Sequence, residues 1–249
     1  MHTVPRTRAR RVAAAGALAT GFALLLPALA KAQGLTVLPV NIEMPAGQMT
    51  TTMTVINNGT TETSVQIRAL AWTQSDGNEQ LTASDEVMAS PPIATIAPGA
   101  TQVVRLVLAK APTDKEATYR LLLDQIPPAA APGTVRLALR LSIPIFAQPS
   151  TRALPHMVYH LENGGGATTL VAVNDGGRHD TVRDLKLVST GGGSATTAAE
   201  GSPYVLSGST RRWAVASTGR APAVGDSLHL TGLTDTGPLD VPVSVIAKP

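Results

Sequence analysis

The chain contains no cysteine. Disulfide bridges and thiolate metal sites are therefore both excluded, even in a compartment where disulfides form. Aromatic side chains make up only 3% of the residues, so the core must be built from valine, leucine, isoleucine, alanine and methionine. No stretch has a convincing helical period. The five histidines are too few and too scattered to indicate much chemistry.

Residues 1–32 have the pattern of a secretory signal peptide. Four arginines and no acidic residue precede an Ala- and Leu-rich run, and Ala30-Lys31-Ala32 forms a small-x-small cleavage site. The apolar run is too short and too rich in alanine for a convincing membrane span, although an uncleaved anchor is the alternative. We expect a secreted mature chain that begins near Gln33 and does not insert into the membrane.

The charge balance changes once this leader is removed. Five of the 20 basic residues and none of the 17 acidic residues lie in residues 1–32, which leaves 15 basic residues against 17 acidic ones and a net charge of −2. A basic surface for nucleic acid or anionic lipid therefore has little support, and we expect no nucleic-acid partner.

From Gly34 onward, short runs with a period of two alternate with turn residues, a pattern that predicts an all-β fold. Pro39 interrupts the first run and favours a position at a sheet edge. The Gly, Pro and Asn turns favour a sandwich over a barrel or a parallel sheet. The strands are expected in these ranges: 35–44, 49–59, 64–72, 101–109 and 119–126.

The composition changes at Gln148-Pro149-Ser150, which has the character of a linker, and glycine is denser after it. We therefore expect an N-terminal immunoglobulin-like domain at 33–149 and a C-terminal β-sandwich domain at 150–249.

Candidate sites for metals, phosphates or catalysis carry little weight. On a strand, His156 and His160 would share a face about 13 Å apart, too far for one metal ion. The glycine triplets 164–166 and 191–193 lack a following Lys-Ser/Thr pair and indicate loops. Three aspartates have a spacing too irregular for calcium and are better explained by turn capping: Asp175, Asp180 and Asp184. No pattern indicates an enzyme, a cofactor or a metal site.

The segment TVRLALRLSIPIFAQPS, residues 134–150, carries apolar side chains at every second position: Val135, Leu137, Leu139, Leu141, Ile143 and Ile145. Such a row normally faces the core of its own sandwich. The predicted strand is longer than usual, however, at roughly 11 to 13 residues against a typical five or six. A long apolar edge is an aggregation hazard unless a partner covers it, and a partner that lacks a strand can use it by β-augmentation.

Several motifs follow one another in an order similar to that of periplasmic pilus-assembly chaperones. They are the leader, a first strand, Asn57-Asn58-Gly59, the segment SPPIATIAPGATQVVRL (90–106), YRLLLDQIPP (119–128) and the long strand that ends in IPIFAQP (143–149). The resemblance covers the mature N-terminal domain, whereas the C-terminal domain agrees in size and texture only.

The resemblance implies two immunoglobulin-like sandwiches at an angle, no enzymatic activity and a periplasmic location. In this family the strand before the linker is lent to a pilin subunit that lacks its last strand, and the subunit is released at an outer-membrane usher. Whether the free protein caps this strand by forming a dimer is left open by the sequence. Carried over by position, the pilin-binding donor residues are Val135, Leu137, Leu139, Leu141 and Ile143.

One departure from the family pattern concerns the subunit's C-terminal carboxylate. Two basic residues of the cleft bind this carboxylate in the best-known branch, and the matching positions here are Asn41 and Pro144. Because a buried carboxylate needs donors or a cation, the anchor candidates are Arg120, Arg140 and Asn41, in that order. For Arg140, an ordinary solvent-facing role is the stronger alternative.

The IPIFA end is similar to the archaic branch of these chaperones, which handles spore-coat-U-like pilins. The short link 126–134 holds few hydrophobic residues and favours rod-like or archaic pili. The main alternative is a secreted immunoglobulin-like structural or adhesive module in which the row at 135–145 is buried in its own core. A copper or zinc β-sandwich protein is disfavoured by the lack of cysteine and of convergent histidines.

Overall fold

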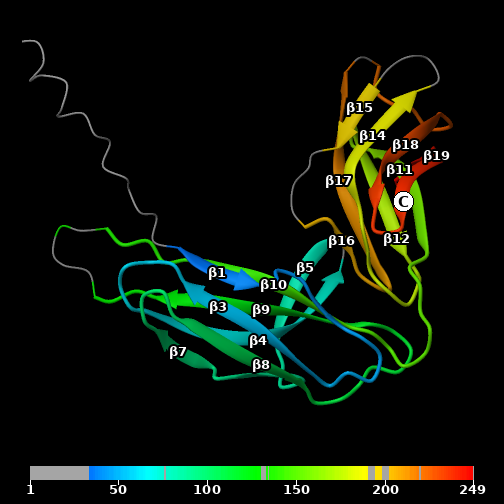
Figure 1. Ribbon diagram of the computed structural model, residues 1–249. Coiled ribbons are helices and arrows are strands. Elements are labelled where there is room, and N and C mark those ends of the chain that lie inside the picture. Colours follow the sequence, from blue (N-terminus) through cyan, green and yellow to red (C-terminus); the bar gives the residue numbers. More distant parts are fainter. Residues whose placement is uncertain are drawn as a thin grey trace, which may run out of the picture. The chain divides into compact units, whose positions relative to one another are not determined.

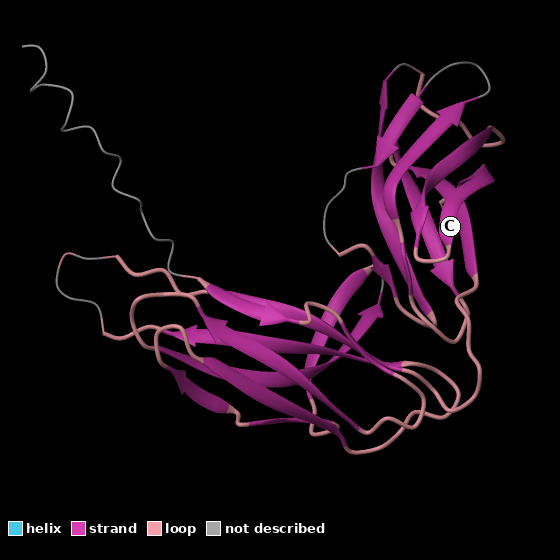
Figure 2. Ribbon diagram, viewed as in Figure 1, coloured by secondary structure: helices cyan, strands magenta, loops and turns pink. Residues whose placement is uncertain are grey.

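The computed structural model describes residues 34–248 apart from 76, 130–132, 134, 190–193, 198–201 and 219. The expected signal peptide at 1–32 and the glycine triplet 191–193 lie outside these residues. Gly34–Pro249 clusters as one compact unit, and every regular element described in it is a strand (Figures 1 and 2). This part of the chain contains no helix able to span a membrane. The all-β prediction is confirmed.

The N-terminal β-domain, defined here as β1–β10, contains two sheets packed around one core. The first sheet has the order β1 (Leu35–Leu38), β3 (Thr50–Asn57), β8 (Thr101–Leu108), β6 (Val87–Ser90). The second has the order β2 (Ile42–Met44), β10 (Arg140–Ala147), β9 (Ala117–Ile126), β4 (Thr63–Ser75), β5 (Asn78–Ala83), with β7 (Ile93–Ile96) also paired to β4. Alternate side chains of both sheets fill the core, among them Met53, Val65, Leu106, Leu121 and Ile145.

The predicted first strand is divided at Pro39. Residues before it form β1, which pairs with β3, and residues after the bend form β2, which pairs in parallel with β10. Both pieces are edge strands of their sheets, as the proline predicted. The chain thus changes from one sheet to the other and brings Ile42 beside Ile145.

The strand predicted to run from about residue 135 is shorter in the structure. β10 begins at Arg140 and has eight residues, and Val135–Leu139 lie outside any strand. The reason is that β9 ends at Ile126, so the segment before Leu139 has no neighbouring strand with which to pair. The prediction of one continuous long strand was therefore wrong for the free chain.

The C-terminal β-domain, defined here as β11–β19, has its own core around Leu161, Leu170, Leu187 and Leu230. The hydrogen-bonded path closes in the order β11 (Met157–Gly164), β12 (Ala167–Asn174), β17 (Ser209–Thr218), β15 (Ser194–Thr197), β14 (Arg183–Ser189), β18 (Ser227–Thr234), β19 (Gly237–Ala247). The two sheets expected of a sandwich are thus hydrogen-bonded to each other at their edges. A separate small sheet pairs β13 (Asp180–Thr181) with β16 (Tyr204–Val205).

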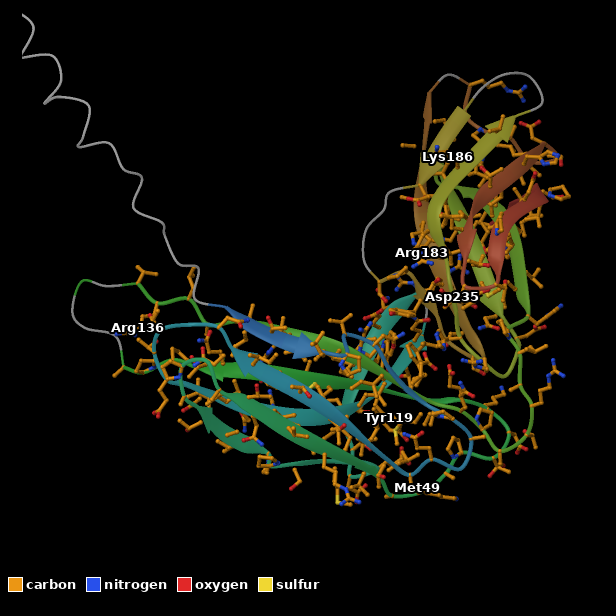
Figure 3. All side chains as sticks on the ribbon, viewed as in Figure 1. Met49, Tyr119, Arg136, Arg183, Lys186 and Asp235 are labelled. Carbon is orange, nitrogen blue, oxygen red and sulfur yellow. The ribbon has the colours of Figure 1, made fainter. Side chains whose placement is uncertain are left out.

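Turn chemistry in this domain agrees with the sequence where it is described. Gly165 and Gly166 both have positive φ, 63° and 78°, and connect β11 to β12 as a two-residue hairpin loop. Asp180 accepts hydrogen bonds from the backbone amides of Thr181 and Asp235. Arg183 lies 3.5 Å from Asp235, and Figure 3 labels both side chains. These aspartates therefore stabilise turns and loops.

Candidate functional site

Among the strands that the structure describes, none pairs with one edge of β10 along part of its length. β10 pairs with β9 throughout, but it pairs with β2 only at Ile145–Ala147. The carbonyl of Leu139 accepts a hydrogen bond from the Gln125 amide at 2.8 Å. Because the pairing direction alternates along an antiparallel strand, the amides of Arg140 and Ser142 point to the open side. Pro144 has no amide hydrogen, so its position on this side leaves no donor unpaired.

The apolar row of the sequence continues past the end of this strand into solvent. Ile143 and Ile145 are buried in the core and Leu141 is partly buried, whereas Leu139 is 41% exposed, Leu137 90% and Val135 91%. Figure 3 labels Arg136 on the same exposed segment. Fully burying one such aliphatic side chain contributes about 1.5–3 kcal/mol. The predicted donor residues thus divide into a buried end and an exposed end, with the open backbone edge between them.

Asp124 connects the start of β10 to β9 through Arg140, and β9 to β4 through Arg68. Asp124 on β9 accepts a hydrogen bond from Arg140 on β10 and another, 2.7 Å long, from Arg68 on β4. The hydrogen bond from Arg140 is the main reason that the pKa of Asp124 is lowered. Arg140, the second anchor candidate, is therefore already engaged with a carboxylate of its own sheet.

Arg120, the first anchor candidate, lies on the outer face of the same sheet. Its neighbours Tyr119 and Leu121 point into the core, and its cross-strand partners are Leu70 and Pro144. The guanidinium carbon lies 3.7 Å from the centroid of the Trp72 ring, within cation–π range. Burial lowers the pKa of Arg120, and Glu79 opposes that shift.

Asn41, the third candidate, is exposed on the bend before β2. The β2–β10 pairing begins with Ile42 opposite Ile145, so Asn41 precedes it beside Pro144. Pro144 in turn pairs with Arg120. Asn41, Pro144 and Arg120 thus lie at one level of the sheet, and Arg120 is the cation among them.

Contacts between the two β-domains surround Arg120. Trp72 and Phe146 of the N-terminal domain form a buried cluster with Leu206, against which Tyr204 packs. The side chain of Gln74 on β4 donates to the carbonyl of Tyr204 and accepts from the amide of Leu206. Aromatic side chains, which are scarce in this protein, are thus concentrated where the two β-domains meet.

A buried carboxylate also joins the two domains. The side chain of Glu116, just before β9, is fully buried and accepts hydrogen bonds from the ring and the backbone amide of His179, at 2.6 and 3.0 Å. Arg178 donates to the same carboxylate at 3.3 Å and lies 3.5 Å from Glu43. Sequence patterns do not reveal such pairs, since the partners lie 62 or 63 residues apart.

The histidines that were considered as metal ligands have other partners. His156 contacts Asp175, and His160 lies 3.4 Å from Glu162, which pairs with Arg212. Among the residues that the structure describes, no group of three His, Asp or Glu side chains could hold a metal ion. The candidate functional features are thus the contacts between the two β-domains and the open edge of β10.

The N-terminal β-domain is similar to a known domain family. Residues 34–153 match the family described as pili and flagellar-assembly chaperone, PapD N-terminal domain. The chaperone protein PapD of Escherichia coli is 32% identical over 87 residues, which cover 33% of this chain and 36% of that protein. The matched region thus spans little more than a third of this relative.

Solved structures of chaperones have the same fold. A chain of the CsuC–CsuE chaperone–tip adhesion subunit complex, from archaic chaperone-usher pili of Acinetobacter baumannii, aligns with a TM-score of 0.63 at 22% identity, covering 87% of this chain and 100% of that chain. A chain of the Salmonella enterica SafA pilin complex with the SafB chaperone aligns with a TM-score of 0.56 at 18% identity, covering 86% and 96%. At this identity the likeness concerns the fold.

Proposed function

We propose that the whole protein is a periplasmic chaperone for pilin subunits, since residues 34–153 match the PapD N-terminal domain of pili and flagellar-assembly chaperones. It holds an incomplete subunit by donor-strand complementation and delivers it to an outer-membrane usher. Residues 1–32 direct export to the periplasm as a cleaved signal peptide, and residues 33–149 and 150–249 are the two domains of the mature chaperone.

The open edge of β10 is the observation that carries this proposal. A subunit strand placed beside Arg140–Pro144 would find the unpaired amides of Arg140 and Ser142. Val135, Leu137 and Leu139 are exposed beyond that edge and would enter the groove of a subunit that lacks a strand, while Leu141 and Ile143 continue the row into the chaperone core. An exposed row of this kind is costly unless it is covered in the working state.

Arg120 is our proposed anchor for the subunit's terminal carboxylate. It is the cation at the level where Asn41 and Pro144 lack charge, and its guanidinium is oriented by Trp72. Arg140 is less suited, because Asp124 already binds it; it orients the start of the donor strand instead. Asn41 is placed to assist as a neutral donor.

We assign the chaperone to the archaic branch, which handles spore-coat-U-like pilins. The IPIFA end of the donor strand and the absence of charge at Asn41 and Pro144 support this assignment, as does the fold shared with a chain from archaic Csu pili. Capping of the exposed row by a second copy in the free state is part of the same proposal.

The test is co-purification of a tagged chaperone with a pilin encoded beside it. Leu137→Arg puts a charge in the exposed part of the row, so pilin recovery should fall at least about tenfold, since a buried unpaired charge costs several kcal/mol. Val103→Arg is the matched control, because Val103 is 53% exposed on β8 of the other sheet. Undiminished recovery with the folded Leu137→Arg variant would refute the proposal.

A further inference from the structure

The guanidinium of Arg120 is held in one position by contacts from both β-domains. Its carbon lies 3.7 Å from the Trp72 ring centroid and 5.7 Å from that of Tyr204. One terminal nitrogen donates to the Ser202 hydroxyl at 3.3 Å. Ser202 is itself bound through its carbonyl by Arg211 at 3.1 Å. Arg120 is therefore a fixed cation whose side chain is only 10% exposed.

The carboxylate that faces this cation is held much more loosely. Glu79 lies 3.6 Å from the same terminal nitrogen of Arg120, which is beyond ordinary hydrogen-bond distance. Its side chain is 31% exposed and belongs to β5, an edge strand whose residues are all exposed. Glu79 can therefore turn toward solvent with little loss of packing, whereas Arg120 cannot.

We propose that Glu79 is an exchangeable counter-ion of Arg120, which the C-terminal carboxylate of a bound pilin subunit displaces. This inference rests on the proposed function, and it adds a residue that regulates the strength of the anchor. Glu79 neutralises the buried cation while the chaperone is free. When a subunit arrives, its carboxylate replaces Glu79; when the subunit leaves, Glu79 returns.

Exchange is favoured over addition of a second carboxylate for two physical reasons. The Trp72 ring covers one face of the guanidinium, and Ser202 already takes one of its donors. Two carboxylates at the remaining donors would repel each other. Displacement of Glu79 therefore costs part of the free energy of subunit binding. This cost lowers the affinity of the chaperone for the subunit and makes transfer of the subunit to the next partner easier.

The proposal predicts that a loss of the Glu79 charge strengthens carboxylate binding. If Glu79 only supported the position of Arg120, Glu79→Gln would weaken carboxylate binding. If Glu79 competes for Arg120, the same substitution strengthens it. Because Trp72, Tyr204 and Ser202 still orient the guanidinium in the variant, the two roles give opposite results.

The experiment measures binding of a fluorescent 16-residue peptide by the mature chaperone. The peptide alternates apolar and polar residues so that it can pair as a strand with the open edge of β10, and it is made with a free carboxylate and with an amide. Glu79→Gln should bind the carboxylate peptide about three- to fivefold more tightly than the wild type, the size expected of a partly exposed ion pair. Binding of the amide peptide should not change.

Three further variants complete the design. Glu62→Gln, at an exposed site on the approach to β4, is the matched control and should change neither affinity. Glu79→Ala should repeat the gain of Glu79→Gln. Arg120→Ala should remove the preference for carboxylate over amide. Thermal melting of each variant checks that it is folded.

The possible failures are distinguishable. A loss or no gain with Glu79→Gln and Glu79→Ala, while wild type prefers carboxylate through Arg120, overturns the role of Glu79 and leaves the anchor intact. An equal gain for the amide peptide also overturns it. If wild type and Arg120→Ala show no carboxylate preference, the proposed anchor is overturned, and the exchange falls with it.

Discussion

The ring of His179 stacks on the ring of Phe146, with centroids 3.6 Å apart and planes inclined by 12°. Phe146 lies near the end of β10, and His179 belongs to the loop that leads into β13. The His179 ring also donates a hydrogen bond to the Glu116 carboxylate. The end of the proposed donor strand is thus directly attached to the C-terminal β-domain.

Glu116 should therefore be important for stability. Glu116→Ala leaves the ring and amide of His179 and the side chain of Arg178 without their shared acceptor. We expect the free energy of unfolding in urea to fall by about 1–3 kcal/mol, since buried hydrogen-bond donors lose their acceptor. Glu62→Ala, at an exposed site, should stay within about 0.5 kcal/mol of the wild type. Equal stability of both variants would contradict this role.

Phe146 should contribute comparably through packing. Its ring is fully buried and contacts Trp72, Tyr204 and His179. Phe146→Ala should cost about 3–5 kcal/mol, whereas Phe146→Leu should cost less because it leaves a smaller cavity. Urea unfolding measures both changes. A cost below about 1 kcal/mol for the alanine variant would mean that the junction contributes little.

The Arg68–Asp124–Arg140 network predicts a pH dependence with a defined sign. The pKa of Asp124 is lowered in the folded chain, mainly by the Arg140 hydrogen bond. The stabilisation of the fold by the Asp124 charge is therefore fully present above the pKa of the unfolded state, about 3.9. It is lost as the pH falls through the lower pKa of the folded state. At pH 7, Asp124→Asn should lower stability on the order of 1 kcal/mol, allowing for solvent screening.

The difference between wild type and Asp124→Asn should shrink when urea unfolding is repeated at successively lower pH below about 3.9, because protonation of Asp124 removes the charge that Arg140 and Arg68 stabilise. Asp85→Asn, at an exposed site before β6, is the control and should show a small and unchanging difference. A difference that grows on acidification would have the wrong sign for this network.

Arg120 should matter for subunit binding more than Arg140. Arg120→Ala should weaken the complex with a pilin by about 2 kcal/mol or more, roughly thirtyfold, because a desolvated charge pair loses its cation. Arg140→Ala, whose partner Asp124 remains bound to Arg68, should weaken it much less. Dissociation rates of the purified complexes measure both. A larger effect of Arg140→Ala would favour the second candidate as the anchor.

Much of the fold follows from local patterns in the sequence. Residues such as Val65 and Ile67 alternate with less buried neighbours, and a period of two reports directly on burial at a sheet face. Pro39 correctly indicated edge strands, but not that the chain changes sheets there, because sheet membership depends on distant partners. The length of β10 was overestimated because an alternating pattern does not show where the neighbouring strand ends.

Only part of the candidate site could be predicted from the sequence in the same way. Arg120 and Pro144 could be related because the sequence predicted that their strands are neighbours, and the register places the two residues opposite each other. Glu79, Trp72 and Ser202 carried no signal, since an interaction across 82 residues, such as that of Arg120 with Ser202, leaves no periodic trace. The two tryptophans and two phenylalanines of the chain were the available clue, because Trp72 and Phe146 meet at the junction.

The most direct test of donor-strand binding is hydrogen exchange of the Arg140 and Ser142 amides, measured by NMR on the free chaperone and on its complex with a pilin. These amides face the open edge of β10 and should exchange at least about tenfold more slowly in the complex, because a subunit strand accepts their hydrogen bonds. The amides of β8, on the other sheet, serve as the internal control. A complex of full occupancy in which Arg140 and Ser142 exchange as fast as in the free chaperone would contradict the account.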